Sequence, residues 1–198
     1  MDKFEAVRFY GLASNFWQLT LNVAEELIER GNPSSMSYEG WGWPSDEEYE
    51  EHTKWSDLNI IEPTLFNFYH GIELSLKSLI LAKEEELKND HKLSNLLTIV
   101  KELYGAVGFV EFYEKYIYQK KLPEVINNFC RETGMTMDLY FQSLKYPTST
   151  KGHEFNHSSL RALDDIGVTL FQEISEDLRS ARKEVQKYIA SECSDVLA

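Results

Sequence analysis

Residues 153–157 read His-Glu-Phe-Asn-His, a pattern of two histidines and a glutamate that zinc hydrolases use. On a helix, histidines four residues apart share one face and can bind Zn²⁺, while the glutamate activates a metal-bound water. Pro147 and a polar stretch precede the pattern and two serines follow it, which is typical of a loop. We therefore expect no metal at His153 and His157 and no cofactor. Zinc hydrolysis through His153, Glu154 and His157 stays the weakest alternative.

Glu73 and Lys77 form a second set of residues whose spacing suggests chemistry. They lie four positions apart in an apolar segment, so a helix would place them on one face. Glutamate four residues before lysine is a favourable helical pair, worth about 0.2–0.5 kcal/mol on an exposed surface. In a buried position the two charges would need each other and further hydrogen-bond partners. We favour a structural role for this pair, and we interpret His91 as a capping or packing residue.

Composition and charge exclude several classes of protein. The chain has 198 residues, of which 42% are hydrophobic, so it can bury one sizeable core. Its net charge of -13 opposes broad binding to nucleic-acid backbones or anionic lipid, although a local basic patch could still bind RNA. Apolar runs fall short of the roughly 20 residues that span a bilayer, and residues 1–16 lack a signal-peptide core. We expect a cytoplasmic protein with free cysteine thiols and no membrane association.

The first third of the chain predicts one long helix and one long connection. Apolar spacing and a capping box predict a helix over residues 3–30, which Gly31 and Pro33 end. Residues 32–61 lack periodicity and contain three tryptophans, Trp41, Trp43 and Trp55, beside the acidic run 46–51. We expect an irregular loop that the tryptophans pin across the bundle, with the acidic run exposed to solvent rather than holding a divalent cation.

The remainder of the chain predicts further helices of a single domain. Helical periodicity covers residues from Pro63 to about 84, 91–104, 109–118, 123–144 with an interruption at Gly134, and 158–190. Apolar residues in the last segment recur at steps of three and four, which indicates a bundle seam and leaves a dimer seam open. We predict an all-α, antiparallel up-and-down bundle over residues 1–198, with residues 1–61 added to a core bundle of residues 62–192.

Three short motifs, in order and with suitable spacing, resemble the HEPN domain family over residues 60–190. They are Tyr69-His70 with Glu73 and Lys77 on an apolar helix, His91-Lys92-Leu93 at a helix start, and Leu144-Lys145-Tyr146-Pro147 before a loop and a long final helix. The resemblance implies a small antiparallel helical bundle that forms a homodimer. The family motif often has arginine where this chain has Lys145.

The same resemblance implies a function without fixing a reaction. HEPN ribonucleases carry an arginine followed, after four to six residues, by a histidine on the final helix. This chain departs from that pattern, since no histidine follows His157. The pair most similar to the motif, His157 with Arg161, has the reverse order. We therefore predict a noncatalytic interaction or nucleotide/RNA-binding module with a protein partner, in a toxin–antitoxin or phage-defence setting.

A divergent metal-independent ribonuclease is the alternative function. In the alternative, a histidine would move the ribose proton and a cation would stabilise the charged phosphate. The candidate catalytic residues are His70, His157, Arg161 and Lys145. The candidate ligand-binding residues are Glu73, Lys77, His91 and Tyr146.

Overall fold

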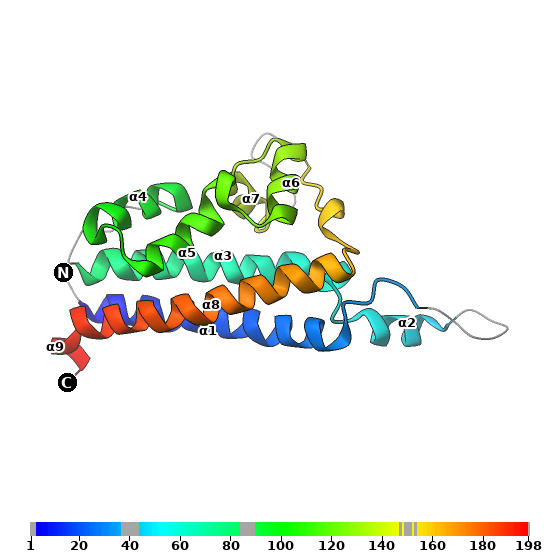
Figure 1. Ribbon diagram of the computed structural model, residues 1–198, viewed down its shortest axis with the longest axis horizontal. Helices are drawn as coiled ribbons and strands as arrows, with labels where there is room; N and C mark the ends of the chain where they lie inside the picture. Colours follow the sequence, from blue (N-terminus) through cyan, green and yellow to red (C-terminus); the bar gives the residue numbers. More distant parts are fainter. Residues whose placement is uncertain are drawn as a thin grey trace.

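The computed structural model describes residues 3–36, 44–83, 90–146, 148, 152 and 154–197 (Figure 1). Within these residues all regular elements are helices, and an isolated bridge between Thr148 and Glu154 is the only pairing of extended backbone. The helices are α1 (Lys3–Arg30), α2 (Asp46–Thr53), α3 (Asp57–Ala82), α4 (Leu93–Tyr104), α5 (Gly108–Ile117), α6 (Glu124–Thr133), α7 (Met137–Ser143), α8 (Asp165–Glu192) and α9 (Ser194–Leu197). The predicted all-α class and the long N-terminal helix are confirmed.

Helix α3 is the centre of the molecule. Every residue from Gly71 to Ala82 is buried, which is typical of a helix covered on all sides. Helices α1 and α8 pack on one side of α3, and α4 packs on the other with α5 beside it (Figure 1). Polar side chains on this part of α3 must therefore find their partners inside the protein.

Close packing of α1 on α3 depends on one glycine. A Cβ atom at Gly71 would lie 2.4 Å from Cδ1 of Trp17, so only glycine leaves room for the indole. Trp17 is fully buried, and its Nε1 donates a hydrogen bond to the carbonyl oxygen of Phe68 at 3.3 Å. The indole thus fills the space between the two helices without losing its polar contact.

Asp57, the first residue of α3, ties together one end of the bundle. Its buried carboxylate accepts hydrogen bonds from the backbone N–H of Ala162 (2.7 Å) and Leu163 (2.9 Å) and from Nδ2 of Asn32 (2.7 Å). Asn32, Ala162 and Asp164 have φ angles of 52°, 57° and 49°, in the left-handed region that favours glycine. These hydrogen bonds hold the loops after α1 and before α8 in otherwise unfavourable conformations.

The segment predicted as an irregular, tryptophan-rich loop contains a helix, α2, so that part of the prediction was wrong. Ser45 caps α2 by accepting a hydrogen bond from the backbone N–H of Glu48, whose side chain accepts one from the Ser45 backbone N–H. Acidic residues in its first turn also complement the helix dipole. Trp55 is half-buried, while Trp41 and Trp43 lie outside the described residues.

Helix α3 begins six residues before Pro63, the residue at which the sequence predicted its first turn. Pro63 therefore lies inside the helix, where it is exposed and removes one backbone hydrogen bond. The extra turns are supported by contacts distant in sequence: the backbone N–H of Asp57 donates to Oδ1 of Asn32 at 2.7 Å, and Ile61 is fully buried.

The predicted interruption at Gly134 is confirmed, and the predicted start of the final helix is corrected. Gly134 has a φ of 68° and separates α6 from α7. Helix α8 begins at Asp165 rather than Ser158, because left-handed residues follow a short 3₁₀ turn at Ser158–Leu160. The apolar seam of α8 is buried within its own chain, which supports the bundle interpretation; its buried members include Leu170, Ile174, Leu178, Ala181 and Val185.

Two expectations from composition also have structural counterparts. Cys130 and Cys193 are both free and buried, and burial raises the pKa of the Cys130 thiol to about 11. None of the described helices combines the length and the apolar character that crossing a bilayer requires.

Candidate functional site

A buried carboxylate, that of Glu73, lies at the centre of the candidate site. Glu73 is on the inner part of α3, and only 2% of its side chain is exposed. Four basic side chains surround it: His70 and Lys77 from the same helix, His91 just before α4, and Lys145 just after α7. We call these five residues the Glu73 cluster.

The contacts of Glu73 involve both carboxylate oxygens. Lys77 Nζ donates a hydrogen bond to Oε1 at 2.7 Å, and His91 Nδ1 lies 2.7 Å from the same oxygen. Lys145 Nζ donates to Oε2 at 3.3 Å, and His70 Nδ1 lies 3.5 Å from Oε2. One carboxylate therefore orients groups from three separate parts of the chain.

The basic groups keep Glu73 ionised despite its burial. Burial alone would raise the pKa of Glu73, but the nearby His70 and the hydrogen bonds from Lys77 and His91 outweigh that effect and lower the pKa below its ordinary range. An ionised carboxylate only accepts hydrogen bonds, so Nδ1 of His91 carries a hydrogen and donates it. Nε2 of a neutral His91 ring is then left as an acceptor at the surface.

Aromatic rings fix the orientation of two members of the Glu73 cluster. The His70 ring stacks on Phe66 at a centroid distance of 5.4 Å and meets Phe16 edge-on at 4.6 Å. Lys145 Nζ lies 3.8 Å from the centre of the Phe141 ring, which is a cation–π contact. The sequence did not predict these ring contacts. The one available signal was the position of Phe66, one helical turn before His70.

The Glu73 cluster carries an excess of positive charge that reaches the surface. Two ammonium groups, those of Lys77 and Lys145, oppose one carboxylate. The side chain of His91 is 61% exposed and that of Lys145 is 22% exposed, whereas Glu73 and Lys77 lie inside. Lys145 is therefore the charged N–H donor that the cluster presents toward the surface, in a protein whose net charge is -13.

The remaining predicted site residues lie apart from this cluster in their contacts. His157 packs near Phe129, its Nε2 is 2.8 Å from Oγ of Ser143, and burial lowers its pKa. Arg161 donates from Nε to Oε1 of Glu62 at 2.7 Å. Tyr146, which follows Lys145 in the chain, is 62% exposed.

The zinc pattern does not form the helical face that its chemistry needs. Glu154 lies in the isolated bridge and His157 in a loop just before the 3₁₀ turn, while His153 lies outside the described residues. In the part of the chain that the structure describes, no group of three or more histidine, cysteine, aspartate or glutamate residues could hold a metal ion.

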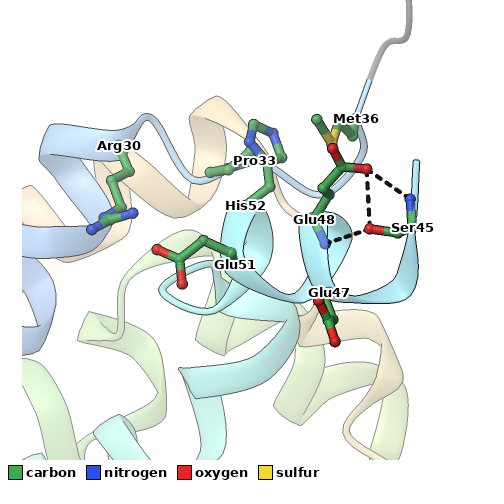
Figure 2. Close-up of a pocket in the computed structure, with 8 residues that line it drawn as sticks. All are labelled: Arg30, Pro33, Met36, Ser45, Glu47, Glu48, Glu51 and His52. Carbon is green, nitrogen blue, oxygen red and sulfur yellow. Dashed lines mark hydrogen bonds between the residues drawn. The ribbon is translucent and has the colours of Figure 1, made fainter.

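An open cavity of about 800 Å³ lies between the end of α1 and α2, away from the predicted site residues (Figure 2). Three of its charged groups, Arg30, Glu48 and Glu51, already have partners within the chain. Glu48 caps α2 through Ser45, Lys54 donates to Glu51 at 2.6 Å, and Arg30 donates to Glu26 at 3.1 Å. The cavity therefore lacks a set of polar groups that converge on one ligand.

Comparisons of this chain with protein-family models, with curated proteins and with solved structures found no match.

Proposed function

We propose that this protein is a noncatalytic binding module with a HEPN-like bundle, and that its Glu73 cluster binds the phosphate of a nucleotide or of RNA. The observation that carries the proposal is the convergence of Lys77, His91 and Lys145 on one ionised carboxylate. Because Glu73 holds these basic groups in place, little conformational freedom is lost when an anion binds. Charge-assisted N–H donors are the groups that phosphate oxygens accept best.

The overall charge supports selective rather than broad binding. At a net charge of -13 the surface as a whole repels a phosphate backbone, so binding depends on local cationic groups such as Lys145 of the Glu73 cluster. A small phosphorylated ligand or a short RNA segment fits this distribution better than long duplex nucleic acid.

Ligand titrations of wild type and matched lysine variants test the proposal. We expect binding of nucleotides or a short single-stranded RNA, and we expect Lys145→Ala to weaken it about tenfold, since one charge-assisted hydrogen bond is lost. Lys120→Ala removes an exposed lysine of the Gln119–Lys121 turn and should leave the affinity unchanged. Absence of binding at millimolar ligand, or equal affinity of the two variants, would contradict the proposal.

A ribonuclease is a second candidate function, because a carboxylate orients an exposed histidine. Glu73 holds Nδ1 of His91, which points Nε2 toward solvent as a general base, with Lys145 nearby to stabilise developing negative charge. His157 and Arg161 are engaged elsewhere, so His91 would take their catalytic role.

Cleavage and binding assays on one variant separate the two candidate functions. If the protein cleaves RNA, His91→Gln should retain affinity but abolish formation of 2′,3′-cyclic phosphate ends. RNA that stays intact with wild-type protein would favour the binding module. Growth arrest on expression, relieved by His91→Gln, would support the toxin–antitoxin or phage-defence setting that the HEPN resemblance implies.

A further inference from the structure

His91 and Lys145 are the members of the Glu73 cluster nearest the surface, and they offer a ligand opposite hydrogen-bonding groups. The side chain of His91 is 61% exposed and that of Lys145 is 22% exposed. Lys145 only donates hydrogen bonds, whereas Nε2 of a neutral His91 ring only accepts them, because Nδ1 already donates to Glu73. A ligand that fills both positions must therefore accept one hydrogen bond and donate another.

The carboxylate of Glu73 keeps these two groups together. Lys145 Nζ lies 3.3 Å from Oε2, and His91 Nδ1 lies 2.7 Å from Oε1 of the same carboxylate. The contact of Lys145 with the Phe141 ring restrains the ammonium group further. Two groups held on one carboxylate are close enough for different oxygens of a single phosphate to contact them.

Phosphate diesters and monoesters differ in what they bring to these two positions. A diester, such as an internal phosphate of RNA, carries one negative charge and only accepts hydrogen bonds, so its oxygens and Nε2 of His91 would meet as two acceptors. A monoester, such as the phosphate of a mononucleotide, has a second ionisation with a pKa of about 6 and can bring a hydrogen to Nε2. When His91 is protonated instead, the doubly charged monoester still attracts the ring and Lys145 more strongly than a diester does.

Among the described residues, the charged and titratable side chains around His91 and its partner Glu73 come from three segments. They are His70, Glu73 and Lys77 of α3, Lys145 after α7, and Asp90 and Lys92 on either side of His91. Asp90 accepts a hydrogen bond from the backbone N–H of Lys92 at 2.8 Å, so its carboxylate is engaged within its own turn. Three lysines and two carboxylates leave a positive balance, which attracts an anion. The acceptor at Nε2 then decides which anion is bound.

We propose that the Glu73 cluster selects a phosphate monoester over a diester, with one proton held between Nε2 of His91 and a phosphate oxygen while Lys145 donates to another oxygen. The inference rests on the proposed phosphate binding and names the phosphate that is bound, which is the terminal phosphate of a mononucleotide or of an RNA strand. Above about pH 7 this proton is absent from both free partners, because the ordinary pKa of histidine is about 6.5 and that of a phosphate monoester is about 6. Affinity for a monoester should therefore fall about tenfold for each pH unit above that range.

Matched pairs of ligands test the selection. Isothermal titration calorimetry at about pH 7 compares AMP with 3′,5′-cyclic AMP, and a short 5′-phosphorylated RNA with the same strand ending in a 5′-hydroxyl. We expect the monoester to bind at least about tenfold more tightly than its partner. A preference confined to one pair would support the selection and identify the monoester as that of a mononucleotide or of an RNA end.

The same titrations separate a failure of this inference from a failure of the proposed function. Equal affinities within both pairs would overturn the selection of a monoester and leave phosphate binding by the Glu73 cluster intact. Absence of binding by all of these ligands would contradict the phosphate binding on which the inference rests.

The pH dependence of AMP binding tests the shared proton. Between about pH 7 and about pH 9, wild type should lose affinity about tenfold per pH unit and take up a proton with each ligand. His91→Gln lacks a ring nitrogen that titrates, so its affinity for AMP should be nearly independent of pH. His52→Gln, at an exposed histidine of α2, is the control and should keep the wild-type slope. A wild-type affinity that does not change with pH, or an equal slope in His91→Gln, would overturn the shared proton.

Discussion

At the scale of single residues, the buried carboxylate of Glu73 and the buried ammonium group of Lys77 balance each other's charge. Glu73→Gln removes the carboxylate and leaves Lys77, whose side chain is only 9% exposed, without its partner. We expect the free energy of unfolding to fall by about 3 kcal/mol, because a buried charge loses its compensation. Urea titration followed by circular dichroism measures this change.

Two variants control the Glu73→Gln measurement. Glu62→Gln breaks the more exposed pair with Arg161 and should lower stability by less than about 1 kcal/mol. Adding Lys77→Met to Glu73→Gln should restore part of the loss, because the unpaired ammonium group is removed as well. If Glu73→Gln costs no more than Glu62→Gln, Lys77 reaches water on its own and the carboxylate does not anchor the cluster.

The lowered pKa of Glu73 also predicts how stability depends on pH. When the pH falls below the ordinary pKa of 4.5, Glu73 becomes protonated in the unfolded chain but stays ionised in the folded protein. Its contribution to stability is therefore complete above that value, declines as the pH falls, and is lost once the pH passes the lowered pKa of the folded state. Urea midpoints between about pH 7 and about pH 3 should fall more steeply for wild type than for Glu73→Gln. Parallel curves for the two proteins would show that Glu73 titrates normally.

At the scale of helices, the approach of α1 to α3 depends on the missing side chain of Gly71. Gly71→Ala would place a Cβ atom 2.4 Å from the buried indole of Trp17, and neither helix can move without disturbing the core. We expect a loss of about 2–3 kcal/mol. Gly11→Ala is the control, because Gly11 is an exposed helical residue with open space at its Cβ position. It should raise stability by about 0.5–1 kcal/mol, and thermal unfolding should separate the two variants in opposite directions.

The hydrogen bonds of Asp57 join the ends of three helices, α1, α3 and α8. Asp57→Ala should cost about 3 kcal/mol, since it removes a buried carboxylate and leaves the N–H groups of Ala162 and Leu163 without their acceptor. Hydrogen exchange should accelerate at those two amides before the rest of the chain responds. Asp165→Ala, at the exposed first residue of α8, should leave their exchange unchanged. Slow exchange at Ala162 in Asp57→Ala would show that another contact holds this loop.

At the scale of the whole molecule, the long helices could be predicted from apolar spacing, but the short polar helix α2 and the first residues of α3 and α8 could not. Helix α3 starts early because Asn32, far away in sequence, receives its first backbone N–H. Helix α8 starts late because Asp57 holds Ala162 and Leu163 in a turn. Both effects are tertiary contacts, which local propensity does not contain.

The candidate site could be predicted only in part from the sequence. Glu73 and Lys77 could be paired from their spacing on one helix, and the pair is present at 2.7 Å. His91 and Lys145 join it only because the start of α4 and the end of α7 both pack against α3, and no local pattern records that packing. The expectation of a capping or packing role for His91 missed its contact with Glu73 for the same reason.

The first and last helices, α1 and α9, bring the two ends of the described chain to the same end of the bundle (Figure 1). Lys3 Nζ lies 3.3 Å from Oδ1 of Asp195, so α1 and α9 meet there. The backbone is therefore nearly a closed ring, and a short peptide could join its ends covalently with little change to the fold. Such a cyclised protein would lose less conformational entropy on folding, and a fusion domain at either end would stand far from α2.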